Sequence, residues 1–166
     1  MRIEDFQPHD TYALVRMWRA SFEHGVGIVD PHPLEEQIAH FRNTVLPANR
    51  VRVAKLADAT VGLLASNPES VSQLYIRVEN IGQGIGFRLL RLAQAESLGS
   101  LWLFTFARNA QARRFYEHHG FVAIAHGFEP MWQLEDVKYQ WVRGGSAGPA
   151  MDSTREPMAG SSRPGA

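Results

Sequence analysis

The sequence contains no cysteine, and this absence excludes several kinds of chemistry. Without a thiol, the chain forms no disulfide, offers no thiolate to a metal ion and forms no acyl-cysteine intermediate. Any group transfer must therefore proceed without a thiol nucleophile of the protein's own.

Net charge and long apolar runs are also missing. The 17 Lys and Arg residues offset 17 Asp and Glu residues, so no net field attracts a polyanion, which argues against nucleic acid as the main partner. No apolar run approaches the ~18 residues of a membrane span, and the first residues, MRIEDFQPHD, contain no apolar signal-peptide core. We therefore expect a soluble, cytoplasmic protein with no membrane segment and a small or locally charged ligand.

The composition divides the chain into two parts. Residues 144–166 contain no aromatic residue and no Val, Leu or Ile, and they are mostly Gly, Ser, Pro and Ala. Because such a segment buries too little apolar surface to offset the entropy of ordering it, we predict a disordered tail there. Residues 1–143 are long enough to form one domain with one core.

Periodicity in residues 1–143 predicts the order β-α-α-β-β-β-α-β-α-β-β. Asp10 is expected to cap the first helix, and the second helix is expected to begin at Pro33 and to end before Pro47. The runs VRVAKL, TVGLLAS and VSQLYIRV predict an antiparallel meander, and LWLFTF a buried strand. Gly120 followed by Phe121 predicts a Schellman motif after the last helix. The expected fold is mixed α/β, with a central mixed sheet flanked by helices.

The most unusual stretch is NIGQGIGFRLL, which places Gly82, Gly84 and Gly86 within five positions at the start of a predicted helix. Unpaired N–H groups at a helix N-terminus form an anion site, and glycine lets a phosphate approach them. A dinucleotide motif would need glycine at Phe87, and a P-loop would need a following Gly-Lys-Ser/Thr. The loop alone leaves a phosphate cradle and a plain turn both open.

A second segment, NAQARRFYEHHGF, follows the predicted buried strand. Together the two segments resemble the GNAT superfamily of acyl-CoA-dependent N-acyltransferases. In that family a Q/R-x-x-G-x-G/A motif follows an L-Y-V-like strand, and an N-x-x-A-x-x-F-Y-x-x-x-G-F segment comes later. The resemblance covers about residues 2 to 143. The chain departs from the pattern at Ile81, where the family has Gln or Arg, at Asn80, where it has an aromatic residue, and at Val78, where it has proline.

The resemblance implies that acetyl-CoA lies in a splay between the fourth and fifth strands. Main-chain groups near Ile76 and Val78 would pair with the pantetheine amides, and Asn109 would cap its helix, with an additional bond to CoA left open. Tyr116 would be the acid that protonates the departing thiolate. The pyrophosphate would be held by the N–H groups of the loop and first helical turn, at Ile81, Gly82, Gly84, Ile85, Gly86 and Phe87.

The predicted reaction is direct transfer of an acetyl group from acetyl-CoA to the primary amine of a small molecule or peptide. No residue is an obvious general base. The glutamates at the ends of the predicted strands and loops are expected to be solvent-exposed, and these are Glu69, Glu79, Glu129 and Glu135. The histidines at positions 24, 32 and 40 do not have the spacing of metal ligands, so no metal site is expected. A homodimer is compatible with the sequence, which does not fix the oligomeric state.

Several alternatives stay open at this point. The same fold could serve as an acyl-CoA-binding sensor without catalysis, which Ile81 and the missing base favour, or as a nucleotide-binding module. Three arginines could approach the CoA phosphates or lie on a solvated helix face, and three apolar residues could line the acceptor pocket or cover the core. The arginines are Arg108, Arg113 and Arg114, and the apolar residues are Phe128, Met131 and Trp132.

Overall fold

The computed structural model describes residues 1–145, and the predicted disordered tail lies outside these residues from position 146 onward. The predicted order of strands and main helices is confirmed. The N-terminal half contains β1 (Arg2–Asp5), a 3₁₀ turn (Pro8–Asp10), α1 (Thr11–Val26), α2 (Leu34–His40), a π-helical turn (Phe41–Val45), α3 (Leu46–Ala48), β2 (Arg50–Leu56) and β3 (Ala59–Ser66). The second half contains β4 (Val71–Ile76), a 3₁₀ turn (Val78–Asn80), α4 (Ile85–Glu96), β5 (Ser100–Phe106), α5 (Ala110–His118), β6 (Val122–Glu129) and β7 (Leu134–Val142).

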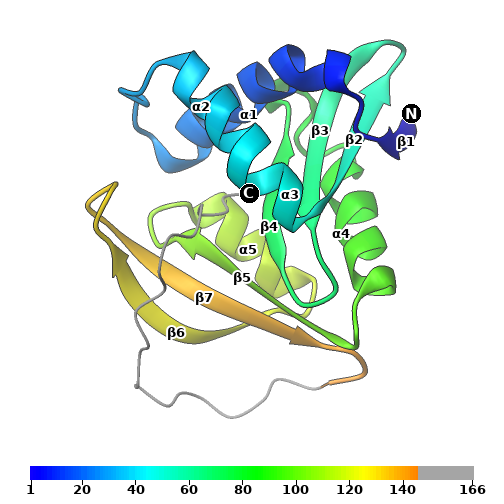
Figure 1. Ribbon diagram of the computed structural model, residues 1–166. Coiled ribbons are helices and arrows are strands. Elements are labelled where there is room, and N and C mark those ends of the chain that lie inside the picture. The colour runs from blue at the N-terminus through cyan, green and yellow to red at the C-terminus, as the bar shows by residue number, and fades with distance from the viewer. Residues whose placement is uncertain (146–166) are drawn as a thin grey trace.

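The strands form two antiparallel sheets instead of one continuous mixed sheet (Figure 1). The first has the order β1-β2-β3-β4, and the second has the order β5-β7-β6. The sheets meet at a parallel bridge between Ser70 and Trp102, where the Trp102 N–H donates to the Glu69 carbonyl at 3.0 Å. Beyond this bridge β4 and β5 diverge, so the expected splay between the fourth and fifth strands is present (Figure 1).

Two apolar clusters lie on opposite faces of β4. One joins α4 and α5 to the sheets and includes Leu74, and the other joins α1 to β2, β3 and β4 and includes Tyr75. This alternation follows from the period of two along a strand. Consecutive residues of β4 therefore face the two helical layers of the domain.

The helix ends confirm some local predictions and correct others. Asn109 accepts a hydrogen bond from the Ala112 N–H at 3.1 Å, as expected of a cap. Phe121 N–H donates to the Tyr116 carbonyl at 3.0 Å, which is the long bond of the predicted Schellman motif. Asp10 stands before α1, but its carboxylate does not cap that helix. It accepts instead from the Gln7 N–H at 3.0 Å and pairs with Lys55 Nζ at 2.7 Å.

Helical structure also continues past the predicted stop at Pro47, because a π-helical turn leads from α2 into α3, where Pro47 lies in the first turn. Within residues 1–145, none of the helices combines the length and the apolar character of a membrane span.

Candidate functional site

A cleft opens where β4 and β5 diverge, and the glycine loop borders it. Its walls come from α1, β4 and α5, together with the residues that precede and begin α4. The residues important here are Ser21, His24 and Gly25 of α1, Leu74, Tyr75 and Ile76 of β4, Ala112 and Phe115 of α5, and Ile81, Gly82, Gly84, Gly86 and Phe87 of the loop and α4.

The last residue of β4 presents its backbone to this gap. Arg77 N–H donates to the Val61 carbonyl at 2.9 Å, toward β3. Because backbone groups alternate in direction along an antiparallel strand, the N–H and C=O of Ile76 point away from β3 and toward the gap. The Ile76 carbonyl accepts from the Ser21 hydroxyl of α1, so its N–H is the group left for a ligand.

Val78 lies outside the strand, in contrast to the sequence-based prediction of a strand running to that residue. It begins a 3₁₀ turn, and its carbonyl accepts from the Ile81 N–H at 3.3 Å. Val78 therefore keeps only its N–H for a pantetheine amide, and the N–H of Ile81 is already engaged in the turn.

The three glycines of the loop serve two different purposes. Gly82 and Gly84 have φ values of +83° and +81°, a left-handed conformation that other residues adopt only with strain. A Cβ at either position would meet no protein atom within 4 Å, so the space beside the loop is open. At Gly86, a Cβ would lie 3.3 Å from Phe115 Cζ, so this glycine permits the close approach of α4 to α5.

The loop and the first turn of α4 carry a run of available backbone donors. From Gly82 to Phe87, none of the N–H groups has an acceptor in the part of the chain that the structure describes, whereas the Arg88 N–H donates to the Gly84 carbonyl. These donors lie at the positive end of the α4 dipole. A run of available backbone donors therefore begins at Gly82, where the sequence predicts an anion cradle.

Asn109, which caps α5, and Tyr116 of α5 lie behind the cleft wall. Asn109 is 2% exposed, and a Cβ on Gly25 would come within 2.7 Å of its Nδ2, so α1 packs directly onto this cap. Tyr116 is 1% exposed and packs against Phe121 at a ring-centroid distance of 5.4 Å. Burial, and secondarily the neighbouring Tyr75, raise the pKa of Tyr116 well above its ordinary value. Its hydroxyl therefore stays protonated at neutral pH and can donate a hydrogen bond.

The position of Arg113 resolves one alternative that the sequence left open. Its Nε donates to Tyr139 Oη at 3.1 Å and its Nη1 donates to the Ala107 carbonyl at 3.3 Å, while Tyr139 Oη donates to Glu117 at 2.7 Å. The guanidinium is therefore held against β7 and the end of β5, away from the glycine loop. Arg108 lies beside Gly27, at the carboxyl end of α1.

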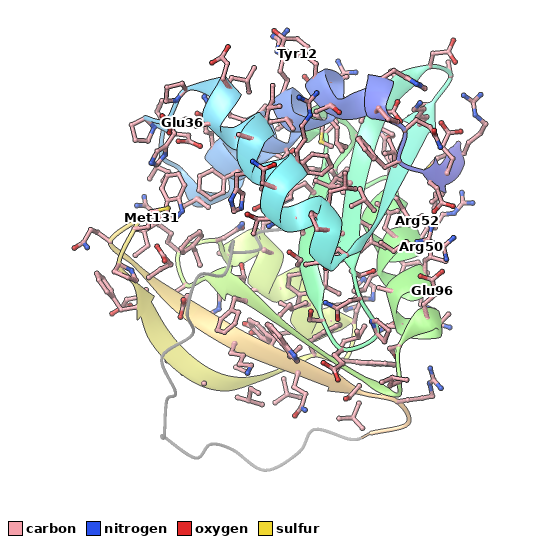
Figure 2. All side chains as sticks on the ribbon, viewed as in Figure 1. Tyr12, Glu36, Arg50, Arg52, Glu96 and Met131 are labelled. Atoms are coloured by element: carbon pink, nitrogen blue, oxygen red, sulfur yellow. The ribbon has the colours of Figure 1, made fainter. Side chains whose placement is uncertain are left out.

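The apolar residues of the β6–β7 hairpin differ in their surroundings, and none of Phe128, Met131 and Trp132 lines the cleft. Trp132 packs against Phe22 of α1 at 4.9 Å and against His32 at 5.2 Å, so it covers the core. Phe128 and Met131 are 46% and 72% exposed, and Figure 2 shows Met131 at the tip of the hairpin. The hairpin therefore packs on α1 through Trp132, and Phe128 and Met131 are exposed at its surface.

Sequence reasoning missed three residues that line the cleft, Ser21, His24 and Tyr75. The spacing of Ser21 and His24 places them on one face of α1. Trp18 lies on the same face of that helix, and this shared face is the feature of the sequence that could have identified them. Of the candidate bases, Glu79 pairs with Arg77 at 3.1 Å and Glu129 accepts from the Trp132 N–H at 2.8 Å. Neither of these two carboxylates lines the cleft.

Comparison with known proteins gives consistent results. Residues 47–123 match the family model described as an acetyltransferase (GNAT) domain, a span that includes β4, the glycine loop, α4, β5 and α5. No curated protein matches the chain by sequence.

Solved structures share the fold over most of the chain. Apo YjaB from Escherichia coli is 21% identical, with a TM-score of 0.71, over 86% of this chain and 97% of its own. PaiA N-acetyltransferase from Thermoplasma acidophilum, solved with coenzyme A, is 16% identical, with a TM-score of 0.65, over 85% and 98% of the two chains. YncA from Salmonella typhimurium, solved with acetyl-CoA, is 17% identical, with a TM-score of 0.64, over 89% and 96%. Residues 47–123 therefore match the GNAT acetyltransferase domain, and the chain as a whole shares its fold with these solved structures.

Proposed function

We propose that the protein is an N-acetyltransferase that moves an acetyl group from acetyl-CoA directly to a primary amine. The observation that carries this proposal is the continuity between the glycine cradle and the gap beside β4, which share one cleft. An elongated cofactor with an anionic end and an amide-containing arm fits that combination. The similar structures from Thermoplasma and Salmonella contain coenzyme A and acetyl-CoA, respectively.

The cofactor would be held mainly by backbone groups. The N–H groups of Gly82, Gly84, Ile85, Gly86 and Phe87 would surround the pyrophosphate at the α4 N-terminus. The pantetheine arm would lie along β4, where the Ile76 N–H faces the gap, with a contact to the Val78 N–H beyond the strand. In this arrangement Ile81 contributes only its side chain, and Asn109 supports the wall by capping α5.

Direct attack is the route that the chain's composition allows, because no cysteine is present to carry the acetyl group. The amine nitrogen would attack the thioester carbonyl, so that a C–N bond forms and the C–S bond breaks. A backbone N–H of β4 that faces the gap would stabilise the developing oxyanion. The Tyr116 O–H would donate a hydrogen bond to the departing thiolate sulfur. Since burial raises the pKa of Tyr116, this phenol donates a hydrogen bond more readily than it gives up its proton.

The acceptor would be an amine on a small molecule or a peptide, and it would enter beside the β6–β7 hairpin. The exposed Phe128 and Met131 give that entrance apolar character. A cytoplasmic location would suit a reaction that consumes acetyl-CoA.

Release of CoA thiol in the presence of an amine panel tests this proposal. The protein has no thiol of its own, so a thiol reagent reports only free CoA. We expect thiol release that depends on both acetyl-CoA and one class of amine.

One observation favours a second candidate, an acyl-CoA sensor of the same fold. Ile81 is 37% exposed at the rim of the cleft and offers no polar contact where the family pattern has Gln or Arg. Saturable binding of acetyl-CoA without thiol release for any amine would support the sensor. Thermal stabilisation by ATP equal to that by CoA would support a nucleotide-binding module instead.

A further inference from the structure

The cleft contains few side chains that can balance the charge of a bound pyrophosphate. Among residues 1–145, no lysine or arginine lines it, and its only basic side chains are those of His24 in α1 and His119 at the end of α5. Arg77, which precedes the loop, is held by Glu79 at 3.1 Å, and Ile81 carries no charge. Backbone dipoles alone would therefore face the phosphates, unless one of the two histidines contributes a charge.

His119 lies directly against the residue that ends the run of available backbone donors. Its ring stacks on the ring of Phe87 with the centroids 5.0 Å apart and 29° between the planes, and it meets Phe115 edge to face at 4.7 Å. All three rings line the cleft. Because Phe87 carries the last N–H without an acceptor in the described part of the chain, the imidazole is fixed beside the glycine cradle, on its α5 side.

The ring nitrogens of His119 are available to a ligand. The backbone N–H of His119 donates to the carbonyls of Phe115 and Tyr116 at 3.2 and 3.0 Å, which fixes the residue at the end of the helix. Neither ring nitrogen has a hydrogen-bond partner among residues 1–145. The protonated ring would offer two N–H donors, and a charge-assisted bond to a phosphate is stronger than one from a neutral donor.

The surroundings of His119 keep its ring mostly neutral at pH 7 when the cleft holds no anion. Burial lowers the pKa of His119 below its ordinary 6.5, and His118, whose ring centroid lies 5.0 Å away, lowers it further. The rings from α4 and α5 that enclose it are uncharged. Across the cleft, α1 presents His24 and β4 presents Tyr75, and neither shifts this pKa. A bound anion would favour the charged form.

We propose that His119 is a cofactor-binding residue, which takes up a proton from solvent as CoA binds and presents its imidazolium to the pyrophosphate. This inference rests on the proposed use of acetyl-CoA. Since a bound anion raises the pKa of a cation that it contacts, the charge contributes fully below the pKa of the free protein. Its contribution is lost as the pH rises through the pKa of the complex. Affinity for the cofactor therefore falls from acidic to alkaline pH.

Isothermal titration with dephospho-CoA between about pH 5.5 and about pH 8 tests this role, because histidine charges change in that range. Dephospho-CoA is the probe because it lacks the 3′-phosphate, whose second pKa of about 6 would add a titration of its own. We expect binding to the wild type to be about fivefold tighter at the acidic end, as for an ion pair worth about 1 kcal/mol.

The variants separate the charge of His119 from a structural role. His119→Gln should bind as the wild type does at about pH 8, where the imidazole is neutral, and should not tighten at lower pH. His118→Gln removes the like charge and should move the pH dependence to higher pH. His126→Gln is the matched control, since His126 is exposed on β6 outside the cleft, and it should keep the pH dependence of the wild type.

A second measurement requires no change at position 119. Titrations of the wild type at about pH 6, in buffers with different ionisation enthalpies, report the protons taken up on binding, and the proposal predicts net uptake. Binding to the wild type with no pH dependence, or a pH dependence that survives in His119→Gln and disappears in His24→Gln, would overturn the role of His119. A wild type that binds neither CoA nor dephospho-CoA at any pH would contradict the proposed function itself.

Discussion

Gly84→Ala places a methyl group in the loop at a residue with φ of +81° and with no protein atom within 4 Å of the new Cβ. The substitution therefore has two separate consequences. The protein itself is strained only through its backbone, whereas a bound pyrophosphate would meet the methyl group. Gly99→Ala is the matched control, because Gly99 has φ of +110° and equally open surroundings but lies outside the cleft, in the turn before β5.

The expected magnitudes differ between stability and binding. A left-handed conformation costs an L-residue roughly 1–2 kcal/mol, and at about 3–4 °C per kcal/mol for a domain of this size both variants should melt about 3–8 °C lower. A backbone bond to a charged phosphate contributes about 1.5–3 kcal/mol. If the methyl group displaces one such bond, CoA binding to Gly84→Ala should weaken by about 10- to 150-fold. Binding to Gly99→Ala should be unchanged.

Isothermal titration of both variants with CoA, at a temperature well below their melting transitions, measures this difference. The assignment of the glycine loop to the pyrophosphate would be refuted if both variants bound CoA as tightly as the wild type does. A loss of affinity common to both would also refute it, since the effect would then arise from backbone strain alone.

Three further substitutions test separate parts of the account. Tyr116→Phe should lower turnover by about 10²-fold or more with its melting temperature retained, and unchanged turnover would remove Tyr116 from the mechanism. Ile81→Arg should tighten CoA binding about two- to fivefold, because an exposed ion pair contributes up to about 1 kcal/mol; titration at low and high salt would show whether the gain is electrostatic. Burial alone would raise the pKa of Asp10, but bonds from Lys55 and the Gln7 N–H outweigh it and lower that pKa below its ordinary 3.8. The Asp10 carboxylate therefore contributes its full stabilisation above about pH 3.8 and loses it as the pH falls further. Urea unfolding of Asp10→Asn should show a free energy of unfolding about 1–3 kcal/mol lower than that of the wild type at pH 7. The free energy of unfolding of this variant should also fall less steeply with pH in the acid range.

The features that the sequence predicted correctly depend on short stretches of chain. Asn109 as a cap and Gly120 followed by Phe121 as a helix end are each set by residues within one or two helical turns. The glycine loop was also recognisable, since the conformations of Gly82 and Gly84 follow from their residue type and from the helix they precede. The order of elements followed from periodicity for the same reason.

The features that it could not predict depend on contacts distant in sequence. The carboxylate of Asp10 was expected to cap α1, but Lys55 of β2 lies beside it and pairs with it. The division into two sheets depends on how far β4 and β5 pair beyond Ser70 and Trp102, which periodicity does not encode. In the sequence, Tyr75 cannot be distinguished from any other strand residue. Its place in the cleft wall depends on the packing of α1 beside β4.

The most direct test of the central claim is the coupled measurement of CoA thiol and acetylated amine from one reaction of the wild-type protein with acetyl-CoA. Acetyl transfer predicts that both products form in equal amounts, that neither forms without the amine, and that no acetyl group stays on the protein. Saturable acetyl-CoA binding with no amine-dependent thiol from any small-molecule or peptide amine would contradict the claim and leave the cleft as a binding site only.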